Sequence, residues 1–90
     1  MKQFHAIVSG RVQGVCFRAE TAAAAQRLGL RGFVRNLADG TVEVRAAGPA
    51  ADIEQFLVYL HRGPRIARVD DVRLDWTARP PLPEGFEVRR

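Results

Sequence analysis

The sequence predicts an α+β fold in which two helices cover one face of an antiparallel sheet. Segments with strand or helix periodicity follow one another in the order strand, helix, strand, strand, helix, strand, with a short extra strand at the C-terminus. Asp39-Gly40, a strong hairpin signal, joins the second and third strands, and each helix has one wide apolar face. Split βαβ units connected in this order form the ferredoxin-like βαββαβ sandwich.

The first strand and the first helix occupy the N-terminal part of the chain. Residues 4–10 form an apolar run typical of a strand. Residues from about 17 to 28 have helical periodicity, and Gly29 is placed to end that helix. One predicted face of this helix consists of Phe17, Thr21, Ala24 and Leu28.

The hairpin is predicted from residues 30–37 and 41–47, which both have the composition of strands. Apolar and polar residues alternate in the second of them, which predicts one buried face and one solvated face. The residues predicted to be buried are Val42, Val44 and Ala46, and those predicted to be solvated are Thr41, Glu43 and Arg45.

The second helix is predicted to begin after Gly48-Pro49 and to end at Gly63-Pro64. Its apolar stripe consists of Ile53, Phe56, Leu57 and Leu60. Residues 66–77 contain the next strand, and we expect Phe56 and Trp76 to lie in the core. The short terminal strand, residues 85–89, follows a turn rich in proline, with Pro80, Pro81 and Pro83.

Length and composition predict one domain, residues 1–90, that is stabilised by packing. Cys16 is the only cysteine, which excludes an internal disulfide and favours a reducing compartment. No apolar run approaches the roughly 20 residues that span a bilayer, and the first residues lack the apolar region of a secretory signal. We expect a cytoplasmic protein, and nothing indicates more than a monomer. The net charge of +4 would attract an anionic substrate or a nucleic acid, without choosing between them.

The segment Gly10-Arg-Val-Gln-Gly-Val-Cys-Phe-Arg18 lies between the first strand and the first helix. A glycine-bracketed loop at a helix N-terminus presents unpaired backbone N–H groups, and the helix dipole adds partial positive charge, so such a loop binds oxyanions. Arg18 adds a planar cation that can bind two phosphoryl oxygens at once. These residues predict a site for a phosphoryl group.

Asn36 stands at the end of the second predicted strand and has two interpretations. A carboxamide offers both a donor and an acceptor, so it can hold a water molecule while it bonds a substrate oxygen. Alternatively, Asn36 caps the turn beside Asp39-Gly40, which is a common use of asparagine. Composition and spacing alone favour the turn cap.

Two motifs, GRVQGVCFR at 10–18 and GFVRNLADGTVE at 32–43, closely resemble those of the acylphosphatase family. The resemblance runs nearly end to end, and the one departure is the last residue, Arg90, where an aromatic is usual. It implies that Arg18 binds the substrate, that Asn36 positions the attacking water, and that the loop 11–17 cradles the phosphate. The predicted phosphate-binding residues are Gln13, Gly14, Val15, Cys16 and Arg18.

The resemblance implies hydrolysis of a small acyl phosphate to a carboxylate and inorganic phosphate, and the available side chains suit this chemistry. A carboxylate leaving group has a conjugate acid with a pKa of roughly 4, so it departs without a general acid. A phosphate monoester expels an alkoxide and needs far more help. The sequence has no metal-ligand cluster, no histidine near either motif and no carboxylate pair. We expect catalysis without metal or cofactor, in which a phosphoryl oxygen accepts the proton of the water.

Other candidate residues have simpler interpretations. Cys16 invites a nucleophile hypothesis because it lies at a helix N-terminus, but a packing role is favoured since no histidine is near in sequence. Arg11 is expected to be a solvated loop charge. Arg35 is expected to face the side of the sheet opposite to that of Asn36. His5 is expected to be a strand residue rather than a ligand, and His61 to lie near the C-terminus of the second helix.

Two functions of other classes are open alternatives. RNA-recognition domains share this order of strands and helices, and Arg31-Gly32-Phe33-Val34 faintly resembles their aromatic motif. In RNA-recognition domains that motif lies in the third strand, whereas the similar residues of this chain lie in the second, so we expect no nucleic acid as partner. We also expect no membrane as partner. A regulatory module that binds a small anion would keep the loop 11–17 without needing Asn36. Release of phosphate from benzoyl phosphate distinguishes the three functions.

Overall fold

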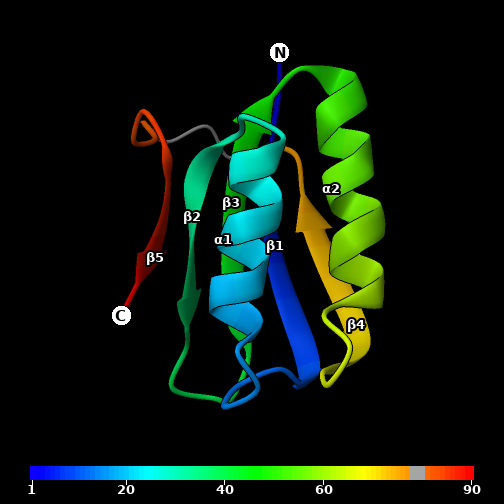
Figure 1. Ribbon diagram of the computed structural model, residues 1–90. Coiled ribbons are helices and arrows are strands. Elements are labelled where there is room, and N and C mark those ends of the chain that lie inside the picture. Colours follow the sequence, from blue (N-terminus) through cyan, green and yellow to red (C-terminus); the bar gives the residue numbers. More distant parts are fainter. Residues whose placement is uncertain (78–80) are drawn as a thin grey trace.

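A computed structural model describes residues 1–77 and 81–90, which form two helices and one five-stranded sheet. Both helices lie on the same face of the sheet (Figure 1). The predicted ferredoxin-like order is confirmed, with boundaries that differ by at most two residues. The elements are β1 (Lys2–Arg11), α1 (Phe17–Arg27), β2 (Arg31–Asn36), β3 (Val42–Gly48), α2 (Ala50–Arg62), β4 (Arg68–Asp75) and β5 (Phe86–Arg89).

The strands are ordered β4-β1-β3-β2-β5 across the sheet. The pairs β4–β1, β1–β3 and β3–β2 are antiparallel, as predicted, whereas β5 runs parallel to β2. The expectation of an antiparallel sheet is therefore wrong at this one edge. The path of the chain explains this direction. The last residue of β4 and the first residue of β2 lie at the same end of the sheet. A strand that starts at this end and pairs with the free edge of β2 runs in the same direction as β2 (Figure 1). Pro80 of the predicted turn lies outside the described residues.

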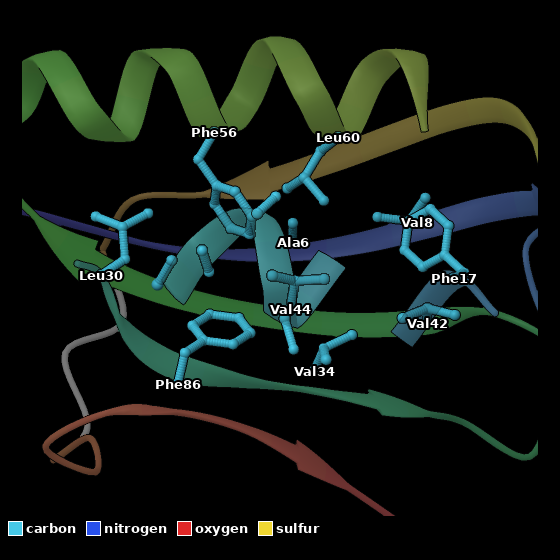
Figure 2. Close-up of a cluster of buried hydrophobic side chains, with 14 of the residues drawn as sticks. Ala6, Val8, Phe17, Leu30, Val34, Val42, Val44, Phe56, Leu60 and Phe86 are labelled. Carbon is cyan, nitrogen blue, oxygen red and sulfur yellow. The ribbon is translucent and has the colours of Figure 1, made fainter. Parts of the chain in front are cut away.

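The core lies between the two helices and the sheet (Figure 2). Phe56 of α2 is fully buried there, as predicted, and its ring centroid lies 6.2 Å from that of Phe4 and 5.8 Å from that of Phe86. Trp76, which was also expected in the core, is 39% exposed. It lies beyond the last residue of the edge strand β4, where its ring contacts Phe4 on one side and the ammonium group of Lys2 on another.

The α1 helix packs through its predicted face, although Leu28 is only half-buried because it lies beyond the last helical residue. Thr21 also links the two helices, since its hydroxyl lies 3.3 Å from the hydroxyl of Tyr59 in α2. Small buried side chains allow the helix to lie close to the sheet (Ala22, Ala24 and Ala25). Within the described part of the chain, no helix is long and apolar enough to cross a membrane.

The side of β3 that faces the helices is fully buried, as predicted (Val42, Val44 and Ala46). The opposite side is not solvated throughout, because Glu43 is only 8% exposed. Its carboxylate accepts hydrogen bonds from His5 Nε2 at 2.8 Å and from Arg35 Nε at 2.5 Å. Since β3 lies between β1 and β2, side chains from both neighbours cover Glu43, and the same side chains pair its charge.

Candidate active site

Gly10 lies at an irregularity near the end of β1, just before the loop that leads to α1. The pairing of β1 with β4 shifts register between Ser9 and Gly10, and Gly10 has a φ of 125°. A Cβ added at this position would lie 2.1 Å from the carbonyl oxygen of Arg68. Only glycine can adopt this backbone here without a clash, so the register shift in β1 requires glycine at this position.

The loop then turns into α1 through two further residues with positive φ, Gly14 at 74° and Cys16 at 61°. Cys16 is the N-cap of α1, and its side chain makes no cap hydrogen bond. The first intrahelical bond runs from the N–H of Glu20 to the carbonyl of Cys16, at 3.0 Å. The N–H groups of residues 17–19 therefore have no partner within the helix and are oriented as in an anion site.

Arg18 and Asn36 line one hollow of about 200 Å³ at the N-terminal end of α1, which we call the Arg18 hollow. Arg18 comes from the first turn of α1 and Asn36 from the last residue of β2. The structure thus brings together the two residues that the sequence singled out. The remaining lining residues come from the loop, α1 and β5: Val12, Gly14, Cys16, Phe17, Ala19 and Val88.

The guanidinium of Arg18 is held by the last strand of the sheet. Its Nη1 donates a hydrogen bond of 3.0 Å to the backbone carbonyl of Arg89 in β5. A guanidinium has five N–H donors, so one bond fixes its position while other donors are available to a ligand in the hollow. This contact could not be predicted from the sequence, because every residue has a backbone carbonyl.

Asn36 is half-buried, and within the described part of the chain one atom of its carboxamide has no hydrogen-bond partner. Its Oδ1 is shielded from solvent and accepts no hydrogen bond from the described residues. The turn is instead capped by Asp39, whose Oδ1 accepts from the N–H of Thr41 at 3.0 Å and from its hydroxyl at 2.5 Å. These two bonds lower the pKa of Asp39. The turn-cap interpretation of Asn36 is therefore wrong, since Asp39 has that role.

Gln13 connects the loop to the hairpin that carries Asn36. Its Nε2 donates to the carbonyls of Leu37 and Thr41, both at 2.8 Å. The sequence predicted Gln13 as a phosphate-binding residue and missed this brace. Its side chain points to the hairpin rather than lining the Arg18 hollow.

Two further predicted phosphate-binding residues, Val15 and Cys16, differ from each other in their surroundings. Val15 is buried and does not line the Arg18 hollow, whereas Cys16 and Gly14 do. The expectation of a packing role for Cys16 is wrong, because its side chain is exposed. The left-handed conformation of this N-cap residue places its side chain at the rim rather than in the core.

The other predicted side chains lie away from the Arg18 hollow. His5 and Arg35 flank Glu43 on the helix-free side of the sheet. Burial raises the pKa of Glu43, but hydrogen bonds from Arg35 and His5 outweigh this effect, and the pKa is lowered overall. Arg11 is exposed at the end of β1, and His61 lies in the last turn of α2 with its Nδ1 2.8 Å from the carbonyl of Leu57.

Phe33 does not present the stacking surface that an RNA-binding sheet needs. It is 7% exposed, and the guanidinium of Arg89 lies 4.1 Å from its ring centroid. A base stacks on an open aromatic face, and here that face is covered by a side chain of the same chain.

Comparison with known proteins identifies the family of this chain. The acylphosphatase family model matches residues 4–88. The chain belongs to the acylphosphatase family. An acylphosphatase from Salinibacter ruber is 46% identical over 89 residues, which cover 99% of this chain and 94% of the relative.

Two solved acylphosphatase structures have the same fold. The crystal structure of the Bacillus subtilis acylphosphatase matches with a TM-score of 0.93 at 32% identity, over 100% of both chains. That of an acylphosphatase from Coxiella burnetii matches with a TM-score of 0.90 at 36% identity, over 98% of this chain and 92% of the other. Acylphosphatases are hydrolases that act on acyl phosphates, so the expected enzyme class is confirmed.

Proposed function

We propose that the Arg18 hollow holds the phosphoryl group of a small acyl phosphate during hydrolysis. The observation that carries this proposal is the convergence of Arg18 and Asn36, from α1 and β2, on one hollow at a helix N-terminus. A guanidinium, unpaired N–H groups and a helix dipole all favour a multiply charged oxyanion at this point.

Arg18 and the loop would stabilise the equatorial phosphoryl oxygens as charge builds up on them. Phosphoryl transfer depends mainly on positioning and electrostatic stabilisation. The bond from Arg18 to the carbonyl of Arg89 keeps the guanidinium in place before the substrate arrives. A group that is already oriented loses little energy to reorganisation during the reaction.

Asn36 would orient the attacking water. Asn36 lines the hollow, and its carboxamide offers both a donor and an acceptor for a water molecule, which would direct the water's lone pair toward phosphorus. In this step an O–P bond forms to the water oxygen, and the P–O bond to the acyl group breaks. The carboxylate leaves with that electron pair, and a phosphoryl oxygen takes the proton of the water.

The chemistry proposed here needs neither a metal nor a second subunit. Arg18 and the unpaired N–H groups, which both come from the first turn of α1, supply the positive potential that the phosphoryl group requires. We therefore propose a cytoplasmic monomer that works without a cofactor, and we expect full activity in the presence of EDTA.

Replacement of Arg18 tests the proposal directly. We expect Arg18→Ala to lose on the order of 10³-fold in the rate of phosphate release from benzoyl phosphate, by analogy with arginines that stabilise transferring phosphoryl groups. Arg18→Lys should also be slow, because an ammonium group cannot form the bidentate fork. The matched control is Arg11→Ala, since Arg11 is exposed and does not line the hollow. If Arg18→Ala kept a tenth of the wild-type rate, the assignment would be wrong.

A further inference from the structure

A second hollow, of about 300 Å³, adjoins the Arg18 hollow, and the two share Cys16 as a lining residue. We call it the Ile66 hollow. We propose that it holds the acyl part of the substrate and that it favours apolar acyl groups. This inference rests on the proposed function of the Arg18 hollow. The lining residues come from the loop, from α1 and from the segment between α2 and β4: Val15, Cys16, Glu20, Pro64, Arg65 and Ile66.

The position of the Ile66 hollow suits the geometry of the reaction. In phosphoryl transfer the attacking and leaving oxygens lie roughly in line on opposite sides of phosphorus. Asn36, which would orient the water, ends β2, whereas the segment 64–66 precedes β4, and these strands lie on opposite sides of β1 and β3. The loop before α1 lies between the two positions (Figure 1). A leaving group opposite the water would therefore point past Cys16 toward Ile66.

The walls of the Ile66 hollow are suited to an apolar group. Ile66 is 64% exposed, Pro64 is half-buried, and Val15 is buried. Covering an exposed isoleucine with an apolar acyl group removes apolar surface from water, which is favourable. The charges of Glu20 and Arg65 are of opposite sign, so the rim has no net charge to select an ionic acyl group. A cavity of about 150 Å³ holds benzene, so a benzoyl group has room here.

Two backbone hydrogen bonds hold the segment that carries Ile66. The N–H of Gly63 donates to the carbonyl of Tyr59 at 2.7 Å, and the N–H of Ala67 donates to that of Pro64 at 3.0 Å. Gly63 has a φ of 70°, and a Cβ there would lie 2.8 Å from Val69 and 3.6 Å from the ring of Phe17. The segment thus packs closely against the first residue of α1. A segment held by such contacts loses less conformational entropy on binding a ligand than a free loop would.

The test compares benzoyl phosphate with acetyl phosphate, two substrates that differ in their acyl group but share the phosphoryl group. In Ile66→Ser we expect kcat/KM for benzoyl phosphate to fall about tenfold, the lower end of what a lost apolar contact costs in a binding pocket. We expect kcat/KM for acetyl phosphate and inhibition by inorganic phosphate to stay within about twofold, because a methyl group scarcely reaches Ile66. The matched control is Val58→Ser, which replaces a similarly exposed apolar residue that lines neither hollow.

The inference fails if Ile66→Ser slows both substrates equally, if it leaves benzoyl phosphate unaffected, or if Val58→Ser has the same selective effect. Each of these results can be seen only while the wild-type protein hydrolyses acyl phosphates. Failure of the proposed function is a different observation, namely that the wild type releases phosphate from neither substrate.

Discussion

At the scale of single residues, the most informative atom is the side-chain oxygen of Asn36, which is buried and accepts no hydrogen bond from the described residues. Buried polar atoms of this kind are commonly explained by a catalytic role or by an ordered water molecule. Two interpretations of Asn36 were possible from the sequence, because asparagine is suited both to capping a turn and to binding a water molecule. The contacts of Asp39 with Thr41 exclude the turn cap.

At the same scale, the lowered pKa of Glu43 leads to a prediction about how the stability of the fold depends on pH. Its pKa is lowered in the folded protein because its hydrogen bonds from Arg35 and His5 outweigh its burial. A carboxyl group with a lowered folded pKa stabilises the fold above its unfolded pKa, and this contribution is lost as the pH falls through the folded value. We therefore expect the free energy of unfolding to decrease below about pH 4.3, the ordinary glutamate pKa.

Urea unfolding from pH 6 downward measures this effect in the wild type and in Glu43→Gln. The variant should show a shallower loss of stability on acidification, since the titrating group is gone. Glu54→Gln, which replaces an exposed carboxylate on α2, should behave like the wild type. Identical acid profiles for the wild type and Glu43→Gln would contradict the role given to this carboxylate.

At the scale of elements, the site depends on how the loop before α1 is attached to the hairpin that ends β2. Gln13 makes this attachment through two bonds of 2.8 Å to Leu37 and Thr41. The periodicity of the sequence predicted both elements but not the brace, because a glutamine that binds backbone carbonyls resembles any polar loop residue. The parallel pairing of β5 was missed for a related reason, since strand direction depends on where the chain returns to the sheet.

Removal of the brace should affect catalysis more than stability. Gln13→Ala deletes two neutral hydrogen bonds, whose acceptors keep other partners, so we expect a loss of about 1 kcal/mol in the free energy of unfolding. We expect kcat/KM for benzoyl phosphate to fall tenfold or more, because small displacements of positioned groups reduce rates strongly, by up to about 10²-fold per ångström.

The matched control for this brace is Gln26→Ala. Gln26 also donates its Nε2 to a backbone carbonyl, that of Phe86 at 3.0 Å, but from the last turn of α1. A comparable loss of stability with unchanged kinetics is expected there. If both glutamine variants had equal kinetic effects, the brace would not position the site.

At the scale of the whole molecule, the fold places two distant sequence motifs at one end of the sheet. The order of strands and helices, the apolar faces and most element boundaries were predictable, because each follows from local periodicity. That Arg18 and Asn36 meet was an expectation drawn from resemblance, since no local pattern fixes the distance between α1 and the end of β2. The contact of Arg18 with β5 and the second hollow at Ile66 depend on the complete tertiary arrangement.

A double-mutant cycle on phosphate release from benzoyl phosphate tests most directly whether Arg18 and Asn36 act on one phosphoryl group. We expect Arg18→Ala to lose about 10³-fold and Asn36→Ala about 10² to 10³-fold. Residues that act as a unit are strongly non-additive, so the double variant should be about as slow as the slower single variant. Losses that multiply across the cycle would show that the two residues act independently, which would contradict a single catalytic hollow.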